Sequence, residues 1–179
     1  MKRRLCFIMC IAVCLLVLVG CNEPPADTTD PNNTPPESAD QNTPPESIDP
    51  ADLETTPYET VNNFVGVTMT VDQETVSNTG LTVVFENNTE RECIYGEYFS
   101  LEKKINGTWY QLPVVVDGNY GFNDIGYPLP PGGSGEFTAE WEWLYGTLEP
   151  GNYRIVKDIL DVREPGDFDT YYLAAEFKI

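Results

Sequence analysis

The chain has 179 residues, of which 29 are acidic and 10 basic, so its formal net charge is −19 at pH 7. Such an excess of negative charge repels the phosphate backbone of nucleic acids, and we expect no nucleic-acid partner. Histidine is absent, which excludes Ser-His-Asp and Cys-His catalysis and removes the commonest zinc ligand.

The N-terminal segment has the three parts of a secretory signal. Basic residues at 2–4 precede an unbroken apolar run at 5–19, and Gly20 then precedes Cys21. The run is too short to be a settled membrane span. Residues 18–21 (LVGC) resemble the lipobox of bacterial lipoproteins. That resemblance implies cleavage before Cys21, a diacylglycerol on its thiol, and attachment to the membrane at the extracytoplasmic face.

A linker is expected to follow the signal. Residues 22–57 hold nine prolines, nine acidic residues and no lysine or arginine, so they cannot bury enough apolar surface to offset the entropy of ordering. The sequence NTPPES also occurs twice there, at 33–38 and 42–47. We predict a signal peptide at 1–20, the lipidated cysteine and a disordered acidic linker at 21–57, and one folded domain at 58–179.

Within that domain the dominant hydrophobic period is two, which is typical of β-strands. The alternating segments are 65–71, 81–85, 99–101, 109–110, 137–145, 155–156 and 171–179. Asn106-Gly107 is a strong hairpin signal, and no segment sustains a helical period. About seven short strands separated by turns predict an all-β, antiparallel Greek-key sandwich.

Tyr153 sharpens this prediction. It follows the turn at 148–152 (LEPGN) and is the first large residue of its strand. A tyrosine in this position can donate its hydroxyl to upstream backbone and form a tyrosine corner. The other interpretation is that Tyr153 is only a core aromatic. For Cys93, the one thiol outside the signal and the lipobox, we expect a buried apolar role.

Several segments together resemble a family of bacterial immunoglobulin-like domains. They are residues 80–88, 99–104, 120–127, 141–146 and 163–169. The resemblance covers about 65–179 and implies an Ig-like sandwich. Such domains occur in lipoproteins, and some are attached to membrane peptidases resembling the beta-lactam sensor. The resemblance brings no established activity and no catalytic residues.

The connection at 117–127 is the candidate partner-binding loop, because long connections in compact domains are usually functional or disordered. We expect it to be ordered without metal, with Tyr120 and Phe122 partly buried and Asp124 capping nearby backbone amides. The candidate residues are Asp117, Asn119, Tyr120, Phe122, Asn123 and Asp124.

Two binding alternatives remain open. Calcium suits oxygen ligands in loops, and further aspartates follow at 158, 161, 167 and 169, although their spacing fits no calcium loop. Trp141 and Trp143 could form a platform for a glycan, but they share the strand parity of Phe137 and Ala139. We therefore expect both tryptophans in the core.

Acidic residues are abundant, but no two are marked as a catalytic pair, so we expect no enzyme and no cofactor. The sequence favours a non-catalytic, lipid-anchored binding or structural module of the cell surface. Its partner would be an envelope protein or a glycan, and the alternative is a calcium- or glycan-binding extracellular domain.

Overall fold

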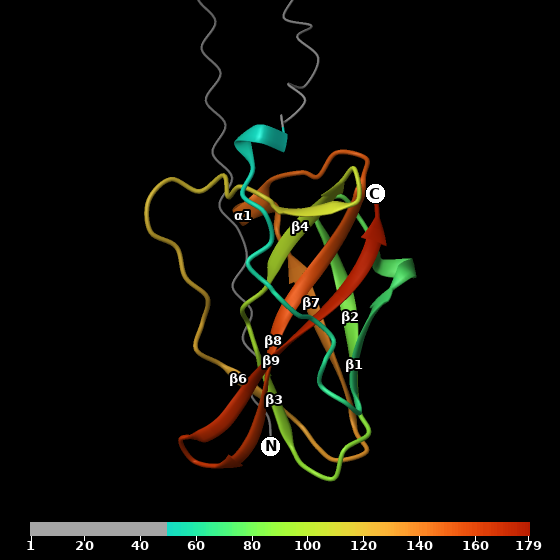
Figure 1. Cartoon of the computed structure of the whole chain (residues 1–179), viewed down its shortest axis with the longest axis vertical. Coiled ribbons are helices and arrows are strands. Elements are labelled where there is room, and N and C mark those ends of the chain that lie inside the picture. Colours follow the sequence, from blue (N-terminus) through green and yellow to red (C-terminus); the bar gives the residue numbers. More distant parts are fainter. Residues whose placement is uncertain (1–49) are drawn as a thin grey trace, which may run out of the picture. The chain divides into compact units, whose positions relative to one another are not determined.

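Two antiparallel sheets are present in the computed structural model, which describes residues 50–179 (Figure 1). The smaller sheet has the order β1-β2-β7, with β1 at Val67–Asp72, β2 at Gly80–Asn87 and β7 at Ser134–Glu140. The larger sheet has the order β5-β4-β8-β3-β6, and β9 pairs with β8. Its strands are β3 (Cys93–Gly96), β4 (Ser100–Ile105), β5 (Thr108–Gln111), β6 (Gly126–Leu129), β8 (Asn152–Glu164) and β9 (Asp167–Lys178). Short helices are η1 (Pro50–Asp52), η2 (Gln73–Thr75) and α1 (Glu142–Tyr145).

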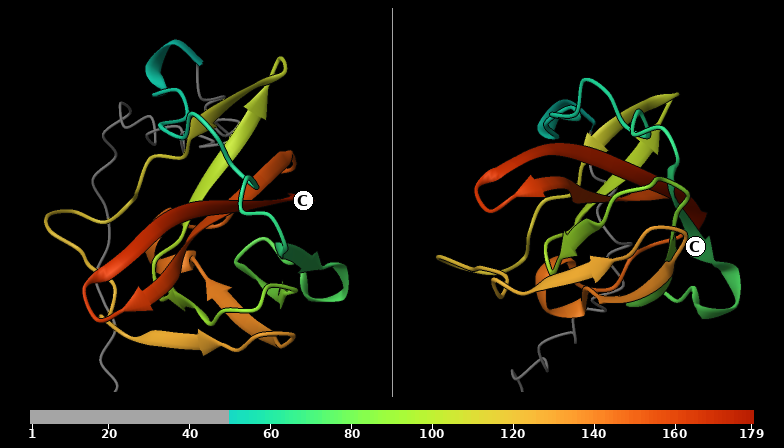
Figure 2. Two further views of the ribbon diagram at one scale, coloured as in Figure 1. Left: turned by 60° about the horizontal axis from the view of Figure 1, so that its bottom comes forward. Right: turned by 90° about the horizontal axis from the view of Figure 1, so that it is seen from below.

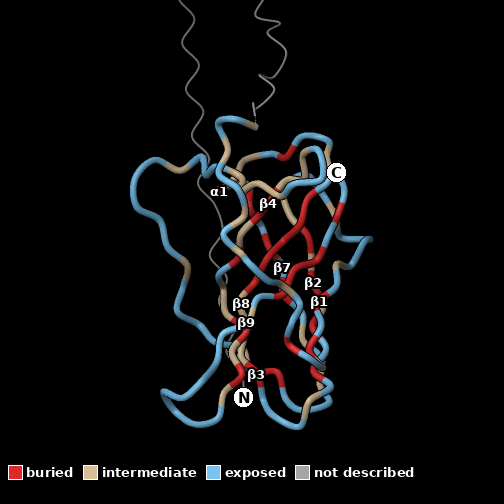
Figure 3. Tube along the Cα trace, in the orientation of Figure 1, coloured by how far each residue is buried: buried red, intermediate tan, exposed pale blue. Residues whose placement is uncertain are grey.

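The core lies between the two sheets, which Figure 2 shows as two layers and Figure 3 marks as a red interior. On β2 the alternation places Leu81, Val83 and Phe85 inward, and all three are buried. Trp141 and Tyr153 are among the largest fully buried side chains. The prediction of an all-β antiparallel sandwich is confirmed, with nine strands in residues 50–179 in place of about seven.

The β4–β5 hairpin forms where the sequence predicts it. Asn106 and Gly107 both have positive φ, 52° and 88°, as a two-residue turn between right-twisted strands requires. The two strands that the pattern misses are β3 and β6. β6 contains Pro128, and it lies at the edge of its sheet, where a residue without an N–H is tolerated.

The folded region begins earlier than the predicted boundary at Tyr58. The backbone N–H of Gln111 donates to the carbonyl of Glu54 (2.8 Å), and that of Thr56 donates to the carbonyl of Trp109 (3.0 Å). These bonds add residues 54–56 to the free edge of β5, so they belong to the domain and not to the linker. Residues 1–49, including the predicted signal and Cys21, lie outside the described residues.

The strand expected over 137–145 is wrong in its second half. β7 ends at Glu140, and the chain then turns into α1. Trp141 is fully buried, and its indole N–H donates to the carbonyl of Asn78 (3.1 Å). Because a helical turn does not keep the parity of a strand, Trp143 faces outward and is 47% exposed. The expectation that both tryptophans lie in the core therefore holds for Trp141 and fails for Trp143.

Tyr153 has the contact that a tyrosine corner requires. Its hydroxyl donates to the carbonyl oxygen of Glu149 at 2.7 Å, across the turn that precedes β8. The ring is buried and stacks on Phe177 of β9, with 5.7 Å between the ring centroids. The bond ties the turn to the start of the long β8–β9 hairpin.

Candidate binding surface

Large apolar side chains are concentrated around the loop between β5 and β6. Nine large hydrophobic residues are exposed within residues 50–179, and six of them lie on this loop or on the segments beside it. The six are Tyr98, Val114, Val115, Tyr120, Ile125 and Trp143. Single exposed hydrophobes are ordinary, but a contiguous group marks an interaction surface.

Phe122 joins the aromatic members of this group. Its half-buried ring meets Phe99, Tyr98 and Trp143 edge to face, with centroid distances of 5.3, 5.4 and 5.9 Å. Tyr120 meets Trp143 in the same way at 6.4 Å. We call Tyr98, Tyr120, Phe122 and Trp143 the aromatic patch. Edge-to-face pairs are favourable contacts, so the patch holds its shape without a ligand.

The loop is also fixed to α1 through its backbone. The N–H of Val115 donates to the carbonyl of Leu144 at 2.8 Å, and the side chain of Leu144 is fully buried. Beneath the loop lies a small pocket of about 170 Å³ that Tyr98, Tyr120, Phe122 and Tyr145 help to line. Burial raises the pKa of the Tyr145 phenol to about 12, so this group is neutral at physiological pH.

The six predicted loop residues divide into three pairs. Tyr120 and Phe122 belong to the aromatic patch, but Tyr120 is exposed and not partly buried as expected. Asn123 and Asp124 line a separate hollow. Asp117 and Asn119 are exposed. Within residues 50–179 no hydrogen bond joins the Asp124 carboxylate to a backbone amide, so its expected capping role is wrong.

The hollow beside Asp124 is acidic. It has a volume of about 390 Å³ and is lined by Glu97, Asp124 and Asp158, together with apolar groups of the loop. Burial raises the pKa of the Asp158 carboxyl above its ordinary value, and the hydroxyl of Tyr127 donates to Glu97. In the part of the chain that the structure describes, no three acidic, cysteine or histidine side chains converge as metal ligands would.

A second hollow is lined by Trp143 and by residues of the smaller sheet that include the outward-facing Thr82 and Thr138. Its volume is about 420 Å³. The lining residues are Thr75, Ser77, Thr79, Gly80, Leu81, Thr82, Thr138, Glu140, Glu142 and Trp143. We call it the threonine hollow. Five side-chain hydroxyls, two carboxylates and one exposed indole meet there, and no lysine or arginine is among the lining residues.

A buried lysine holds the segment that carries Tyr98. β3 and β4 pair with the same strand, β8, at Ile159–Asp161 and Tyr153–Val156 respectively. The ladder is interrupted between them, and Lys157 lies opposite the interruption. Its ammonium donates to the carbonyls of Gly96 and Tyr98, both at 2.7 Å, and lies 3.5 Å from the ring centroid of Phe137.

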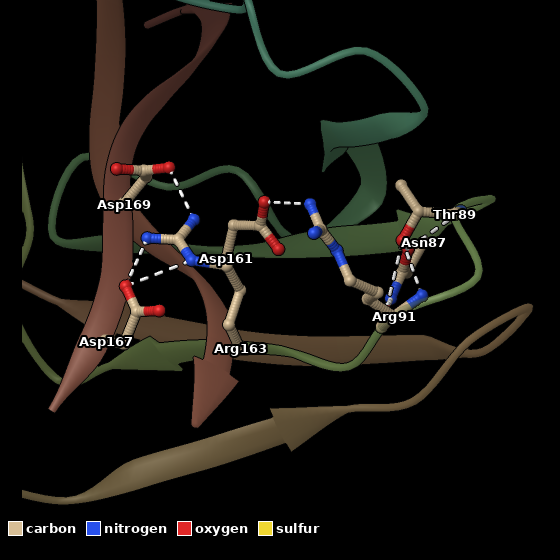
Figure 4. A network of polar contacts seen from close by, with 7 residues as sticks. All are labelled: Asn87, Thr89, Arg91, Asp161, Arg163, Asp167 and Asp169. Carbon is tan, nitrogen blue, oxygen red and sulfur yellow. Dashed lines mark hydrogen bonds and ion pairs between the residues drawn. The ribbon is translucent and has the colours of Figure 1, made fainter. Parts of the chain in front are cut away.

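Polar contacts of a different kind link the β2–β3 turn to the β8–β9 hairpin (Figure 4). Arg91 pairs with the buried carboxylate of Asp161. Arg163 pairs with Asp167 at 2.6 Å and with Asp169 at 2.6 Å. These contacts hold turn and hairpin in shape and engage both arginines within the chain, so this network offers no free cation to a ligand.

Residues 63–178 match the family described as "Bacterial Ig-like domain". The chain belongs to this family. The Ig-like domain expected from the sequence is thereby confirmed, and membership indicates a non-catalytic extracellular module. No curated protein matches the chain.

The Ig-like domain is also similar to a solved structure, the ASH / PapD-like domain of human CEP192 (PapD-like domain 7). The identity is 12% and the TM-score 0.30, and the match covers 69% of this chain and 96% of that one. Within residues 50–179, no helix has the length and apolarity needed to cross a bilayer.

Proposed function

We propose that this protein is a lipid-anchored binding module, attached to the membrane through Cys21 and displaying its Ig-like domain on the extracytoplasmic side. The signal, the lipobox at 18–21 and the acidic linker support the anchor and the location. One acyl chain gives only marginal membrane binding, whereas two or more on one cysteine give stable attachment. The protein is anchored and has no catalytic role.

The observation that carries the binding role is the aromatic patch together with Val115. Aromatic side chains are enriched where proteins bind one another, because they bury much area with few rotatable bonds. These rings are already packed against one another before binding, which reduces the entropy lost on association. The partner is an envelope protein, and its contact surface is not acidic, because the net charge of −19 repels acidic surfaces.

The test is site-specific photo-crosslinking in intact cells of the source organism. A photoreactive amino acid at Val115 should crosslink to a defined protein, and Tyr120→Ser should greatly weaken that product. The matched control is the same group at Phe168, an exposed hydrophobe on the β8–β9 hairpin. Absence of a discrete product at Val115, or the same product from Phe168, would rule out the patch as the partner surface.

A further inference from the structure

We propose that the threonine hollow is a binding site for a saccharide without acidic groups. This inference goes beyond the proposed function, because it assigns a ligand class to a second site that shares only Trp143 with the aromatic patch. Its volume of about 420 Å³ lies in the range of small-molecule sites. Its lining residues include residues of β2 and β7, Thr75 of η2, and Glu142 and Trp143 of α1.

The strand register explains why the floor is open. Gly80 pairs with Glu140, and Thr82 pairs with Thr138. Gly80 has no side chain to fill the space above the sheet, and an added Cβ would lie 2.8 Å from the carbonyl oxygen of Ala139. Glycine is therefore required at this point of close backbone approach, and the space beside Glu140 stays empty.

The hydrogen-bonding groups suit a ligand that both donates and accepts. The hydroxyls of Thr82 and Thr138 bond to each other at 3.0 Å, which leaves one hydroxyl hydrogen and further lone pairs for a ligand. Within residues 50–179, neither Glu140 nor Glu142 forms an ion pair, and the hydroxyl of Thr79 has no partner. Two free carboxylates are strong acceptors for the hydroxyls of a sugar.

Trp143 supplies the apolar wall. The indole is 47% exposed and is held by edge contacts with Tyr120 and Phe122. The C–H face of a sugar ring can stack on such a surface while its hydroxyls reach polar groups beside it, as an amphipathic tryptophan favours. An apolar peptide side chain would find few partners among the hydroxyls, and phosphate, sulfate or uronate groups would meet Glu140 and Glu142 at close range.

Calorimetric titration of residues 50–179, which contain a complete core of their own, tests the inference. The probes are neutral tetrasaccharides of glucose, mannose and N-acetylglucosamine, with tetragalacturonate as the acidic comparison. At least one neutral probe should bind saturably in the millimolar range or more tightly, and tetragalacturonate should not bind. Absence of saturable binding by every neutral probe, or equal binding of the acidic one, would overturn the proposal.

Two variants test whether the saccharide binds in the threonine hollow. Glu140→Gln and Trp143→Ala should each weaken the saccharide by about tenfold or more, the cost of roughly one good contact. Glu164→Gln is the matched control because Glu164 is an exposed carboxylate near the tip of the β8–β9 hairpin, and it should bind like the unaltered chain. An unchanged affinity in Glu140→Gln would place the sugar elsewhere. The crosslinking experiment at Val115 is independent of this titration. Failure of saccharide binding would therefore not contradict a partner protein at the aromatic patch.

Discussion

Lys157 is a fully buried basic residue. Its environment determines whether the free energy of unfolding rises or falls with pH. Burial lowers the pKa of its ammonium from 10.5 to about 7. The nearby carboxylates of Asp158 and Glu97 act against burial and raise this pKa, while the amine nitrogen donates to two backbone carbonyls and lies over the ring of Phe137. Those carbonyls lie at the interruption between β3 and β4, so the lysine replaces strand partners that they lack.

We predict that the free energy of unfolding rises from about pH 7 toward pH 10. In this interval the unfolded chain keeps the lysine proton and the folded chain has lost it, so a higher pH favours the folded state by at most about 1.4 kcal/mol per pH unit. Chemical denaturation at several pH values should show this rise, and Lys157→Met should remove it. Lys178→Met, at the exposed end of β9, is the control.

Lys157→Met has to be compared with the parent chain, because other groups make the free energy of unfolding fall as the pH rises. Burial raises the pKa of the Cys93 thiol and of the Tyr58 and Tyr145 phenols. The folded state therefore holds these protons more tightly, and stability falls once the pH exceeds their ordinary values. Both chains share these groups, so the difference isolates Lys157. An identical slope in Lys157→Met would show that the lysine is not responsible.

Tyr153 should contribute to stability through its hydroxyl. Tyr153→Phe keeps the stacked ring but leaves the carbonyl of Glu149 without its donor, so we expect a loss of about 1–3 kcal/mol in the free energy of unfolding. Tyr171→Phe is the control, since the Tyr171 hydroxyl has no hydrogen bond within residues 50–179. Equal melting temperatures for both variants would mean that the corner bond is not stabilising.

The two neighbouring tryptophans should differ clearly in how much each contributes to stability. Trp141→Ala removes a fully buried indole and should cost about 3–5 kcal/mol of stability. Trp143→Ala removes a half-exposed ring and should cost about 1 kcal/mol or less. Thermal melting of both variants measures this. Comparable large losses would mean that Trp143 is part of the core after all.

At the scale of elements, the sequence is most informative where one side of a strand is buried. The period of two in β2 and β9 and the Asn106-Gly107 turn reflect local physics, so both hairpin and strands are predictable. β3 and β6 are too short and too interrupted by glycine and proline to show a period. The end of β7 has a signal that can be read in retrospect: Leu144 is apolar at the wrong parity for a strand, and Gly146 follows it as a helix terminator.

The candidate site was predictable only in part, because its residues come together from separate segments of the chain. A loop rich in large apolar residues is visible in the sequence, and Tyr120 and Phe122 do join the surface. Tyr98 and Trp143 come to the same surface from separate elements through contacts with Phe122. Such long-range contacts depend on how β4, the loop and α1 pack, and no local pattern carries that information. The threonine hollow is assembled in the same way from η2, β2, β7 and α1.

The loop between β5 and β6 should not depend on calcium. Its aromatic contacts and the bond from Val115 to Leu144 fix it, and its carboxylates do not converge with others. We predict that millimolar calcium leaves the melting temperature unchanged and that chelation has no effect, since a ligand of the folded state would raise it by mass action. A rise of several degrees that Asp124→Asn abolishes would instead support the calcium alternative.

At the scale of the whole molecule, the net charge bears on the membrane attachment that we propose. The chain carries a formal net charge of −19, which repels anionic lipid headgroups. Charge therefore gives no attraction to an anionic membrane surface, and the membrane attachment that we propose depends on the lipid at Cys21. In the proposed processing, cleavage before Cys21 removes the apolar run at 5–19. Without a lipid on Cys21, the cleaved protein would be released from the membrane.

The proposed lipidation of Cys21 can be tested directly. Cys21→Ser removes the only nucleophile of the lipobox, and a hydroxyl does not form the thioether that the lipid requires. We predict that labelled fatty acid is incorporated into the parent chain and not into the variant, and that the variant keeps its signal or leaves the membrane fraction. Cys14→Ser, which lies within the apolar run, is the control and should be labelled normally. Equal labelling of Cys21→Ser and the parent would end the lipoprotein interpretation.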